Sequence, residues 1–231
     1  MTISPVDFAS LLCSRLCHDL LSPVGALNNG LELLADEQDP EMRQRCLELL
    51  AESAKASANK LKFFRLAFGA AGGFGEAIDS REARVAIEGL FGDGHRVNLG
   101  WLVEDATLPK AAIKVLLNLA LIGGDALIRG GQLDVGAEVH DGQVEIVVRA
   151  DGPRIVLDNE LRTTLQDGQQ GDAPITARGA AAYLVHELVA AGGGTVQVSD
   201  PDDPVLLFGA AFSTGEAAFP DSLQTQKPAE R

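Results

Sequence analysis

A single apolar stripe runs along the first 34 residues of the chain. Its members are three or four positions apart, a spacing that places them on one face of an α-helix. They are Leu12, Leu16, Leu20, Val24, Leu27, Leu31 and Leu34. Ser4 and Asp7 have the spacing of a capping box, and Pro5 suits the first helical position. The pattern therefore predicts one long helix that begins at Pro5 and ends near Ala35.

The same signals recur a few residues later and predict a second helix. Asp39 and Pro40 repeat the cap and the first-turn proline, and Gly69 follows the end of the apolar face. This face consists of Cys46, Leu47, Leu50, Ala54, Leu61, Phe64 and Phe68. Because the connection is short, the two helices are expected to run antiparallel, as a helical hairpin over residues 1–70.

A lone hairpin cannot bury two apolar stripes of this length. Each helix is about 45 Å long at the rise of an α-helix, so a large apolar area would face water. Two hairpins that pair around a two-fold axis form a four-helix bundle, which buries both stripes. The sequence therefore predicts a homodimer formed through residues 5–68.

After a glycine-rich break at residues 71–77, helices and strands alternate. Apolar periodicity predicts helices at 81–91, 108–128 and 175–191. Apolar or alternating runs predict strands at 96–103, 133–140, 143–149, 195–199 and 205–212, with a two-residue turn at Asp141-Gly142. The chain is thus of the α+β class, with an α/β sandwich at 76–213 after the hairpin. Residues 214–231 are polar and predicted to be a disordered tail.

The composition narrows the class of partner. Hydrophobic residues make up 46% of the chain and charged residues 23%, the balance of a folded globular protein. A net charge of −14 disfavours binding to nucleic acid or an anionic membrane, since both need a basic face, so proteins are the expected partners. No uncharged apolar stretch could span a bilayer and residues 1–10 lack the order of a secretory signal, which predicts a cytoplasmic protein.

Three cysteines, Cys13, Cys17 and Cys46, lie in the predicted helices. An odd number of cysteines argues against a disulfide framework, so free thiols are expected. Cys13, Cys17 and His18 could offer metal ligands on adjacent helical turns. No fourth ligand is in sight, and no metal site is predicted.

His18 is the candidate for chemistry. It follows Leu16 of the apolar stripe by two positions, which places its ring on the polar flank of the first helix, facing solvent. A neutral imidazole nitrogen is a competent nucleophile. The carboxylate of Asp19 can hold one ring nitrogen protonated, so that the other keeps its lone pair for attack. The plain alternative is that His18 is a solvated surface side chain.

Five residues beyond the histidine are predicted to support it. Ser22, one turn on, is placed to hydrogen-bond the ring or an oxygen of the group bound to it, and Pro23 removes one backbone hydrogen bond of the helix. Gly25 costs about 1 kcal/mol of helix stability relative to alanine, which suggests a use for its missing side chain. Ser22, Gly25, Asn28 and Asn29 would form a smooth patch along which a helix of a partner could lie.

The run CHDLLSP at residues 17–23 resembles the phosphoacceptor box of sensor histidine kinases. In that family an acidic residue follows the histidine directly and a proline follows it by five positions. The box lies on the first helix of a dimeric hairpin, and an α/β nucleotide-binding sandwich comes next in the chain. The resemblance implies that His18 carries a phosphoryl group.

Three segments of the second domain resemble the nucleotide-binding motifs of these kinases. In each, one residue matches: Asn118 of the asparagine box, Asp151 of the first glycine box and Gly179 of the lid. The companion positions do not match, and hold Ile122, Pro153, Arg154 and Ala181. Ile122 stands where kinases use asparagine to hold magnesium, and Pro153 and Arg154 are expected to obstruct a nucleotide pocket. The resemblance therefore implies a degenerate sandwich that binds no ATP and no metal.

Along nearly its whole length the chain resembles the ChpT family, which combines an intact histidine box with such a sandwich. The resemblance implies a histidine phosphotransferase of a bacterial multistep phosphorelay. His18 would take phosphoryl from the receiver domain of a hybrid kinase of the CckA type and pass it to response regulators such as CtrA and CpdR, with Mg²⁺ held by the receiver. Arg15 either stabilises the charge of phosphohistidine or is a solvated surface residue. Two alternatives remain: an ATP-dependent sensor kinase, and a non-catalytic dimeric scaffold that binds receivers.

Overall fold

The structure is a computed structural model that describes residues 3–69, 77–91, 97–169 and 174–214. The predicted glycine-rich break and the predicted C-terminal tail lie almost entirely outside the described residues. Among the described helices, none is both long enough and apolar enough to cross a membrane.

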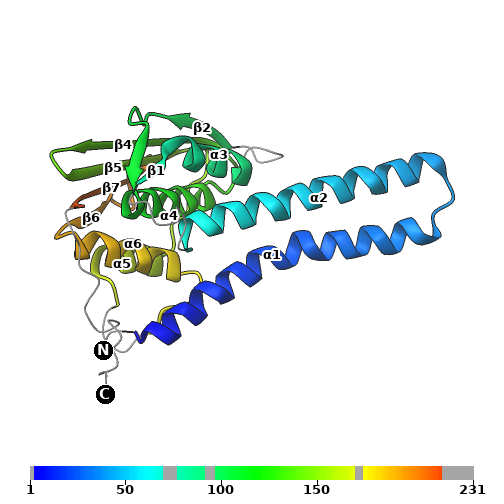
Figure 1. Cartoon of the computed structure of the whole chain (residues 1–231), viewed down its shortest axis with the longest axis horizontal. Helices are drawn as coiled ribbons and strands as arrows, with labels where there is room; N and C mark the ends of the chain where they lie inside the picture. Colours follow the sequence, from blue (N-terminus) through cyan, green and yellow to red (C-terminus); the bar gives the residue numbers. More distant parts are fainter. Residues whose placement is uncertain (1–2, 70–76, 92–96, 170–173, 215–231) are drawn as a thin grey trace, which may run out of the picture.

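Two long helices form an antiparallel hairpin that projects from the rest of the molecule (Figure 1). α1 spans Pro5–Asp36 and α2 spans Pro40–Ala67. Ser4 and Asp39 cap them, since the side chain of each accepts from the backbone amide three residues on, at 3.1 and 3.0 Å. The predicted hairpin and both predicted caps are confirmed, whereas the pairing of two hairpins into a bundle stays a prediction.

The remaining described residues form a two-layer α/β sandwich. Its main sheet consists of β2 (Val97–Trp101), β4 (Gly131–His140), β5 (Gln143–Asp151), β6 (Thr195–Val198) and β7 (Leu206–Ser213). The strands lie in the order β2-β4-β5-β7-β6, with β2 parallel to β4 and every other pair antiparallel. Two short strands, β1 (Ala77–Asp79) and β3 (Thr107–Pro109), form a separate antiparallel pair.

Helices cover one face of the main sheet (Figure 1). They are α3 (Ser80–Phe91), α4 (Lys110–Ala126), α5 (Asn159–Asp167) and α6 (Ala180–Ala191). The core lies between these helices and alternate side chains of β5 and β7, which are Val144, Ile146, Val148, Ala150, Leu206, Phe208, Ala210 and Phe212. The α+β class and the sandwich are confirmed.

The base of the hairpin belongs to the same core. Phe63 and Phe64, in the last turns of α2, are buried within the cluster that includes α4 and the sheet. Asn118 of α4 strengthens the junction, because its amide nitrogen donates to the carbonyl of Ala67 at 3.2 Å. At the other helix, the ring of Phe8 packs edge-on against Tyr183 of α6, with centroids 5.1 Å apart. The two helices are therefore anchored to the sandwich at separate points.

The predicted strands and turns of the second domain are confirmed to within a few residues. Asp141 and Gly142 connect β4 to β5 with φ angles of 50° and 77°, the positive values that a two-residue hairpin turn of this kind requires. Two strands of this domain were not predicted, namely the short β1 and β3, which pair with each other ahead of the turn. The three cysteines are free thiols; Cys46 is buried, and the two on α1, Cys13 and Cys17, are exposed.

Two predicted helix starts are wrong, and one helix was not predicted. The helix expected from Leu108 begins at Lys110, because Pro109 disfavours helical backbone at the residue before it. The helix expected from residue 175 begins at Ala180, since the Thr176 hydroxyl accepts from the Gly179 amide at 3.2 Å and forms a turn instead. α5 was missed because a nine-residue helix offers too few buried positions to show a period.

Candidate functional site

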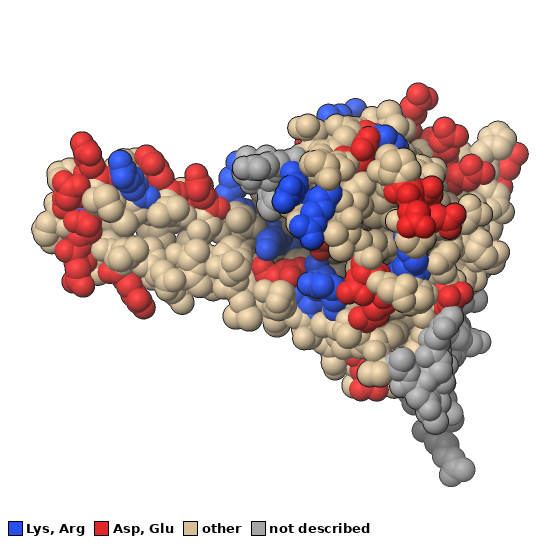
Figure 2. Space-filling model, turned by 180° about the vertical axis from the view of Figure 1, so that it is seen from behind, with Lys and Arg blue, Asp and Glu red and all other residues tan. Residues whose placement is uncertain are grey.

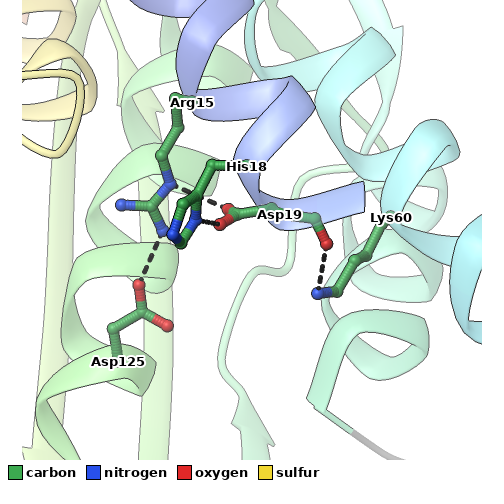
Figure 3. Close-up of polar contacts among 5 residues, drawn as sticks. All are labelled: Arg15, His18, Asp19, Lys60 and Asp125. Carbon is green, nitrogen blue, oxygen red and sulfur yellow. Dashed lines mark hydrogen bonds and ion pairs between the residues drawn. The ribbon is translucent and has the colours of Figure 1, made fainter. Parts of the chain in front are cut away.

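His18 lies on α1 near the place where the hairpin meets the sandwich. Its side chain is 82% exposed, so the predicted orientation toward solvent is confirmed. The ring nitrogen Nδ1 lies 3.1 Å from Oδ1 of Asp19 (Figure 3). In the tautomer protonated at Nδ1, the Nδ1–H group donates a hydrogen bond to this carboxylate. The lone pair is then on Nε2. This geometry suits a nucleophile that a partner molecule can approach from solvent.

Arg15 holds the second oxygen of the Asp19 carboxylate. Its Nε donates to Oδ2 of Asp19 at 2.8 Å, one helical turn away. Its Nη2 donates to Oδ2 of Asp125, near the end of α4, at 2.9 Å. The guanidinium thus joins the hairpin to the sandwich (Figure 3).

The surroundings of Arg15 favour its charged form. Burial works against the charge, but the carboxylates of Asp125 and Asp19 outweigh it, and the pKa of the Arg15 guanidinium is raised. Only 13% of its side chain is exposed. Of the two interpretations that the sequence left open, the solvated surface arginine is wrong.

Asp125 lies at the edge of a cavity and keeps 51% of its side-chain surface accessible. The atoms packed around its carboxyl group nevertheless desolvate it and raise its pKa, and Arg15 opposes that shift. Asp19 adds a smaller repulsion, and Arg178 a smaller attraction. The ion pair with Arg15 therefore offsets part of the cost of placing a carboxylate here.

Lys60 completes the site from α2. Its Nζ donates to the backbone carbonyl of Asp19 at 2.8 Å. In a regular helix this carbonyl would accept from the amide of the residue four positions on, but that residue is Pro23, which has no N–H. Lys60 supplies the hydrogen bond that Pro23 removes, so the backbone at Asp19 is fixed from the neighbouring helix.

A cavity of about 630 Å³ opens beside His18, between α1, α2 and the sandwich. Its polar lining consists of Ser14, Arg15, His18, Asp19, Lys60, Asp125, Asp158 and Arg178. Its buried apolar lining includes Leu90, Phe91, Leu121, Ile122, Ala126, Leu161 and Ala181. Figure 2 shows Lys and Arg side chains gathered where the hairpin meets the sandwich, while acidic side chains crowd the far end of the hairpin.

Comparison with known proteins identifies the family. A family model described as "Histidine phosphotransferase C-terminal domain" matches residues 80–204. A curated relative, the "Protein phosphotransferase ChpT" of Brucella abortus (strain 2308), is 35% identical over 198 residues, which cover 86% of this chain and 92% of the relative. The chain belongs to the ChpT family of histidine phosphotransferases.

One solved structure agrees with this assignment. A structure described as a bacterial phosphotransferase matches with a TM-score of 0.79 and 32% identity, over 91% of this chain and 98% of that one. The histidine kinase AdeS of Acinetobacter baumannii matches at a TM-score of 0.44 and 16% identity, over 85% of this chain and 97% of that one. The second similarity is too distant to support an argument.

In this ChpT-family chain, two residues that match kinase motifs, Asn118 and Asp151, form hydrogen bonds within the protein. Asn118 is buried outside the cavity and bonds the carbonyls of Ala67 and Lys114. Asp151 accepts from Arg149 at 2.6 Å on the sheet. Neither side chain lines the cavity, so neither is placed to contact a ligand there.

The replaced positions divide into two groups. Ile122 and Ala181 line the cavity with hydrocarbon and supply no oxygen ligand for magnesium. Pro153 and Arg154 are exposed and do not line this cavity, and their obstruction of a nucleotide pocket stays a prediction. Among the described residues, no group of three or more His, Cys, Asp or Glu side chains is placed to hold a metal ion.

The residues predicted as a docking patch lie on α1 beyond the histidine. Ser22, Asn28 and Asn29 are exposed, and Gly25 faces open space, since a Cβ added there would meet no atom within 4 Å. Pro23 is buried instead, and it shapes the helix without contributing to this surface. A partner helix would therefore meet a continuous surface without large side chains at these positions.

The sequence did not reveal Lys60 or Asp125. A signal for the first was present, because Pro23 leaves the carbonyl of Asp19 without its helical donor and so requires a donor from elsewhere. No local signal marks Asp125, which lies 110 positions from Arg15 and meets it only after the chain has folded.

Proposed function

We propose that this protein is a histidine phosphotransferase that carries a phosphoryl group on His18 between aspartates of receiver domains. The observation that supports it most is the exposed ring, with Nδ1 beside Asp19 and Nε2 left for attack. Membership of the ChpT family gives independent support. Each transfer would form a phosphohistidine and then consume it.

The first step is an in-line attack by the Nε2 lone pair of His18 on the phosphorus of a receiver's aspartyl phosphate. The N–P bond forms as the P–O bond to the receiver's aspartate breaks, and that aspartate leaves as a carboxylate. The proton on Nδ1 stays with the ring, where the negative charge of Asp19 offsets the positive charge that the ring gains. In the second step a carboxylate oxygen of another receiver attacks the phosphorus, and the lone pair returns to Nε2.

This cycle consumes no nucleotide, and we propose that the chain binds neither ATP nor a metal. The apolar Ile122 and Ala181 in the cavity support this, because they remove groups that would hold magnesium and phosphates. Mg²⁺ bound in the acidic pocket of the receiver would neutralise the oxygens of the phosphoryl group. The free thiols of the chain agree with a reducing cytoplasm as the place of reaction.

We assign the partners from the resemblance to the ChpT family: the receiver of a hybrid kinase of the CckA type as donor, and regulators of the CtrA and CpdR type as acceptors. The patch of Ser22, Gly25, Asn28 and Asn29 beside the histidine supports docking of a receiver helix. A receiver placed there would bring its aspartate near Nε2.

We further propose that the protein is a homodimer. The hairpin exposes large apolar side chains that one copy cannot cover, namely Val6, Leu21, Val24, Leu31, Leu33, Met42, Leu47, Leu49 and Leu61. Cys17, Val24 and Leu31 follow one another at seven-residue intervals, the repeat of helices that pack in bundles. A second hairpin laid on this stripe would form the four-helix bundle.

The test incubates the purified protein with a radiolabelled phospho-receiver and magnesium, without ATP. We expect acid-labile, base-stable label on the wild type and none on His18→Ala. His140→Ala is the matched control, because His140 is also exposed and its Nε2 lies 3.2 Å from the following Asp141. Receivers that bind without labelling the wild type would contradict the proposal and leave the scaffold alternative.

A further inference from the structure

We propose that Asp125 of the sandwich is a positioning residue for His18, and that it acts through Arg15 and Asp19. This inference rests on the function proposed above. It assigns the degenerate sandwich a part in the chemistry that requires no nucleotide.

Three side chains, those of Asp125, Arg15 and Asp19, connect the sandwich to the imidazole of His18 without a gap (Figure 3). Asp125 Oδ2 accepts from Arg15 Nη2 at 2.9 Å, and Arg15 Nε donates to Asp19 Oδ2 at 2.8 Å. Asp19 Oδ1 then lies 3.1 Å from Nδ1 of His18. Only the last of these contacts is made by neighbours in the sequence; the first joins residues 110 positions apart.

The orientation of Asp19 depends on Arg15. A carboxylate beside an exposed ring can rotate to satisfy itself with water, and Arg15 prevents this by holding one oxygen so that the other faces Nδ1. The guanidinium is planar and rigid, so its contact with Asp125 fixes the direction in which Nε points. Without the carboxylate of Asp125, one edge of the guanidinium has no partner and Arg15 can swing toward solvent.

Charge works in the same direction. Arg15 alone would neutralise Asp19 and weaken its attraction for a proton on Nδ1. With Asp125 present, the three groups carry a net charge of −1, so Asp19 remains an effective acceptor when the ring becomes positive during attack. Asparagine at position 125 keeps the size of the side chain and removes that charge.

The ion pair between Arg15 and Asp125 could also serve only to hold the hairpin against the sandwich, and this role can be distinguished by experiment from the positioning of Asp19. The hairpin is also anchored by Phe63, by the bond from Asn118 to Ala67 and by the contact of Phe8 with Tyr183. Loss of a half-exposed ion pair will therefore leave the two parts docked. What changes is the position of Asp19, and the protonated nitrogen of the ring reports on it.

The experiment compares the full-length protein with Asp125→Asn. Nitrogen-15 NMR of labelled histidine measures the fraction of His18 that carries its proton on Nδ1, and single-turnover transfer from a phospho-receiver at saturating concentration measures the rate. We expect the Nδ1–H fraction to fall and the rate to drop about three- to fivefold. Asp125→Glu is expected to restore both values, since an exposed, longer carboxylate can still reach Arg15.

Asp151→Asn is the matched control. Asp151 is exposed to a similar extent, 45% against 51%, and pairs with Arg149 on the sheet without lining the cavity beside His18. It is expected to change neither readout. An unchanged Nδ1–H fraction in Asp125→Asn overturns the inference, even if the rate falls, because Asp125 would then act on the receiver. Absence of label on the wild type contradicts the proposed function instead, and the NMR comparison remains valid.

Discussion

The two ends of the helical hairpin are built from the same helices but differ in how far their apolar side chains are buried. At the base, Phe63 and Phe64 of α2 are buried in the core of the sandwich. At the far end, Leu31 and Leu33 of α1 and Leu49 of α2 are exposed. The base is completed by the chain itself, whereas the far end presents apolar side chains that this chain leaves uncovered.

His18 lies on α1 between the anchored base and the exposed far end of the hairpin. Arg15, one turn toward the base, is held by the sandwich through Asp125, and Gly25, two turns toward the far end, faces open space. The residues that orient the ring therefore come from the anchored side, and the surface that a receiver can approach lies on the free side. The contrast predicts that substitutions at the base alter folding, and that substitutions at the far end alter association.

The largest effect is expected at the base. Phe63→Ala removes a fully buried ring from the junction of hairpin and sandwich, and should lower the free energy of unfolding by about 3–5 kcal/mol. Leu49→Ala, at the exposed far end of the same helix, should cost less than about 1 kcal/mol in a monomeric background. Urea unfolding monitored by circular dichroism measures both. Equal losses would mean that the far end is as tightly packed as the base.

The next largest effect is expected on dimerisation, at the far end of the hairpin. Leu31→Glu places a charge in the stripe that we assign to the dimer interface, and should weaken dimerisation by at least about 100-fold, because the carboxylate would be buried without a partner. Leu33→Glu is the matched control, since Leu33 is exposed to a similar extent, 63% against 57%, but lies on another side of α1.

Sedimentation equilibrium of the two variants decides between the alternatives. A dimer that survives Leu31→Glu but not Leu33→Glu would place the interface on the other side of the helix. A wild type that sediments as a monomer would refute the homodimer altogether. In either case the sandwich should remain folded, because its core contains neither residue.

Local signals were sufficient to predict most of the fold. The caps at Ser4 and Asp39 and the turn at Asp141-Gly142 depend on residues within a few positions, and all three are confirmed. The start of α4 was misplaced where a local rule was overlooked, since Pro109 constrains Leu108. The division into domains at residue 70 stays a prediction, although α2 contributes to the core of the sandwich.

The candidate site was only partly predictable, because its contacts span the chain. The pair of His18 and Asp19 is visible in the sequence as neighbours, and its geometry suits the role predicted for it. The bond from Arg15 to Asp125 depends on how the hairpin returns to α4, which no local pattern encodes. Lys60 is intermediate: the proline implies that a donor is needed, and only the packing of α2 against α1 says which one.

The smallest expected effect on stability tests the hydrogen bond from Lys60 to the carbonyl of Asp19. Lys60→Met leaves the carbonyl of Asp19 without its donor and should destabilise the protein by about 1 kcal/mol, the net value of one hydrogen bond. In a Pro23→Ala background, the new amide at position 23 can bond this carbonyl directly, as in a regular helix. The same Lys60→Met change should then cost almost nothing, which gives a coupling of about 1 kcal/mol in a double-mutant cycle.

Lys62→Met controls for the general loss of a lysine from this part of α2, because Lys62 lies two positions on and is exposed. It should show no coupling to Pro23→Ala. If Lys60→Met costs the same in both backgrounds, the lysine stabilises α1 by charge alone, and the backbone at Asp19 is not held from α2. If the coupling is found, Asp19 is fixed at its carbonyl by Lys60 of α2 and at its carboxylate by Arg15, which is itself held by Asp125 of the sandwich.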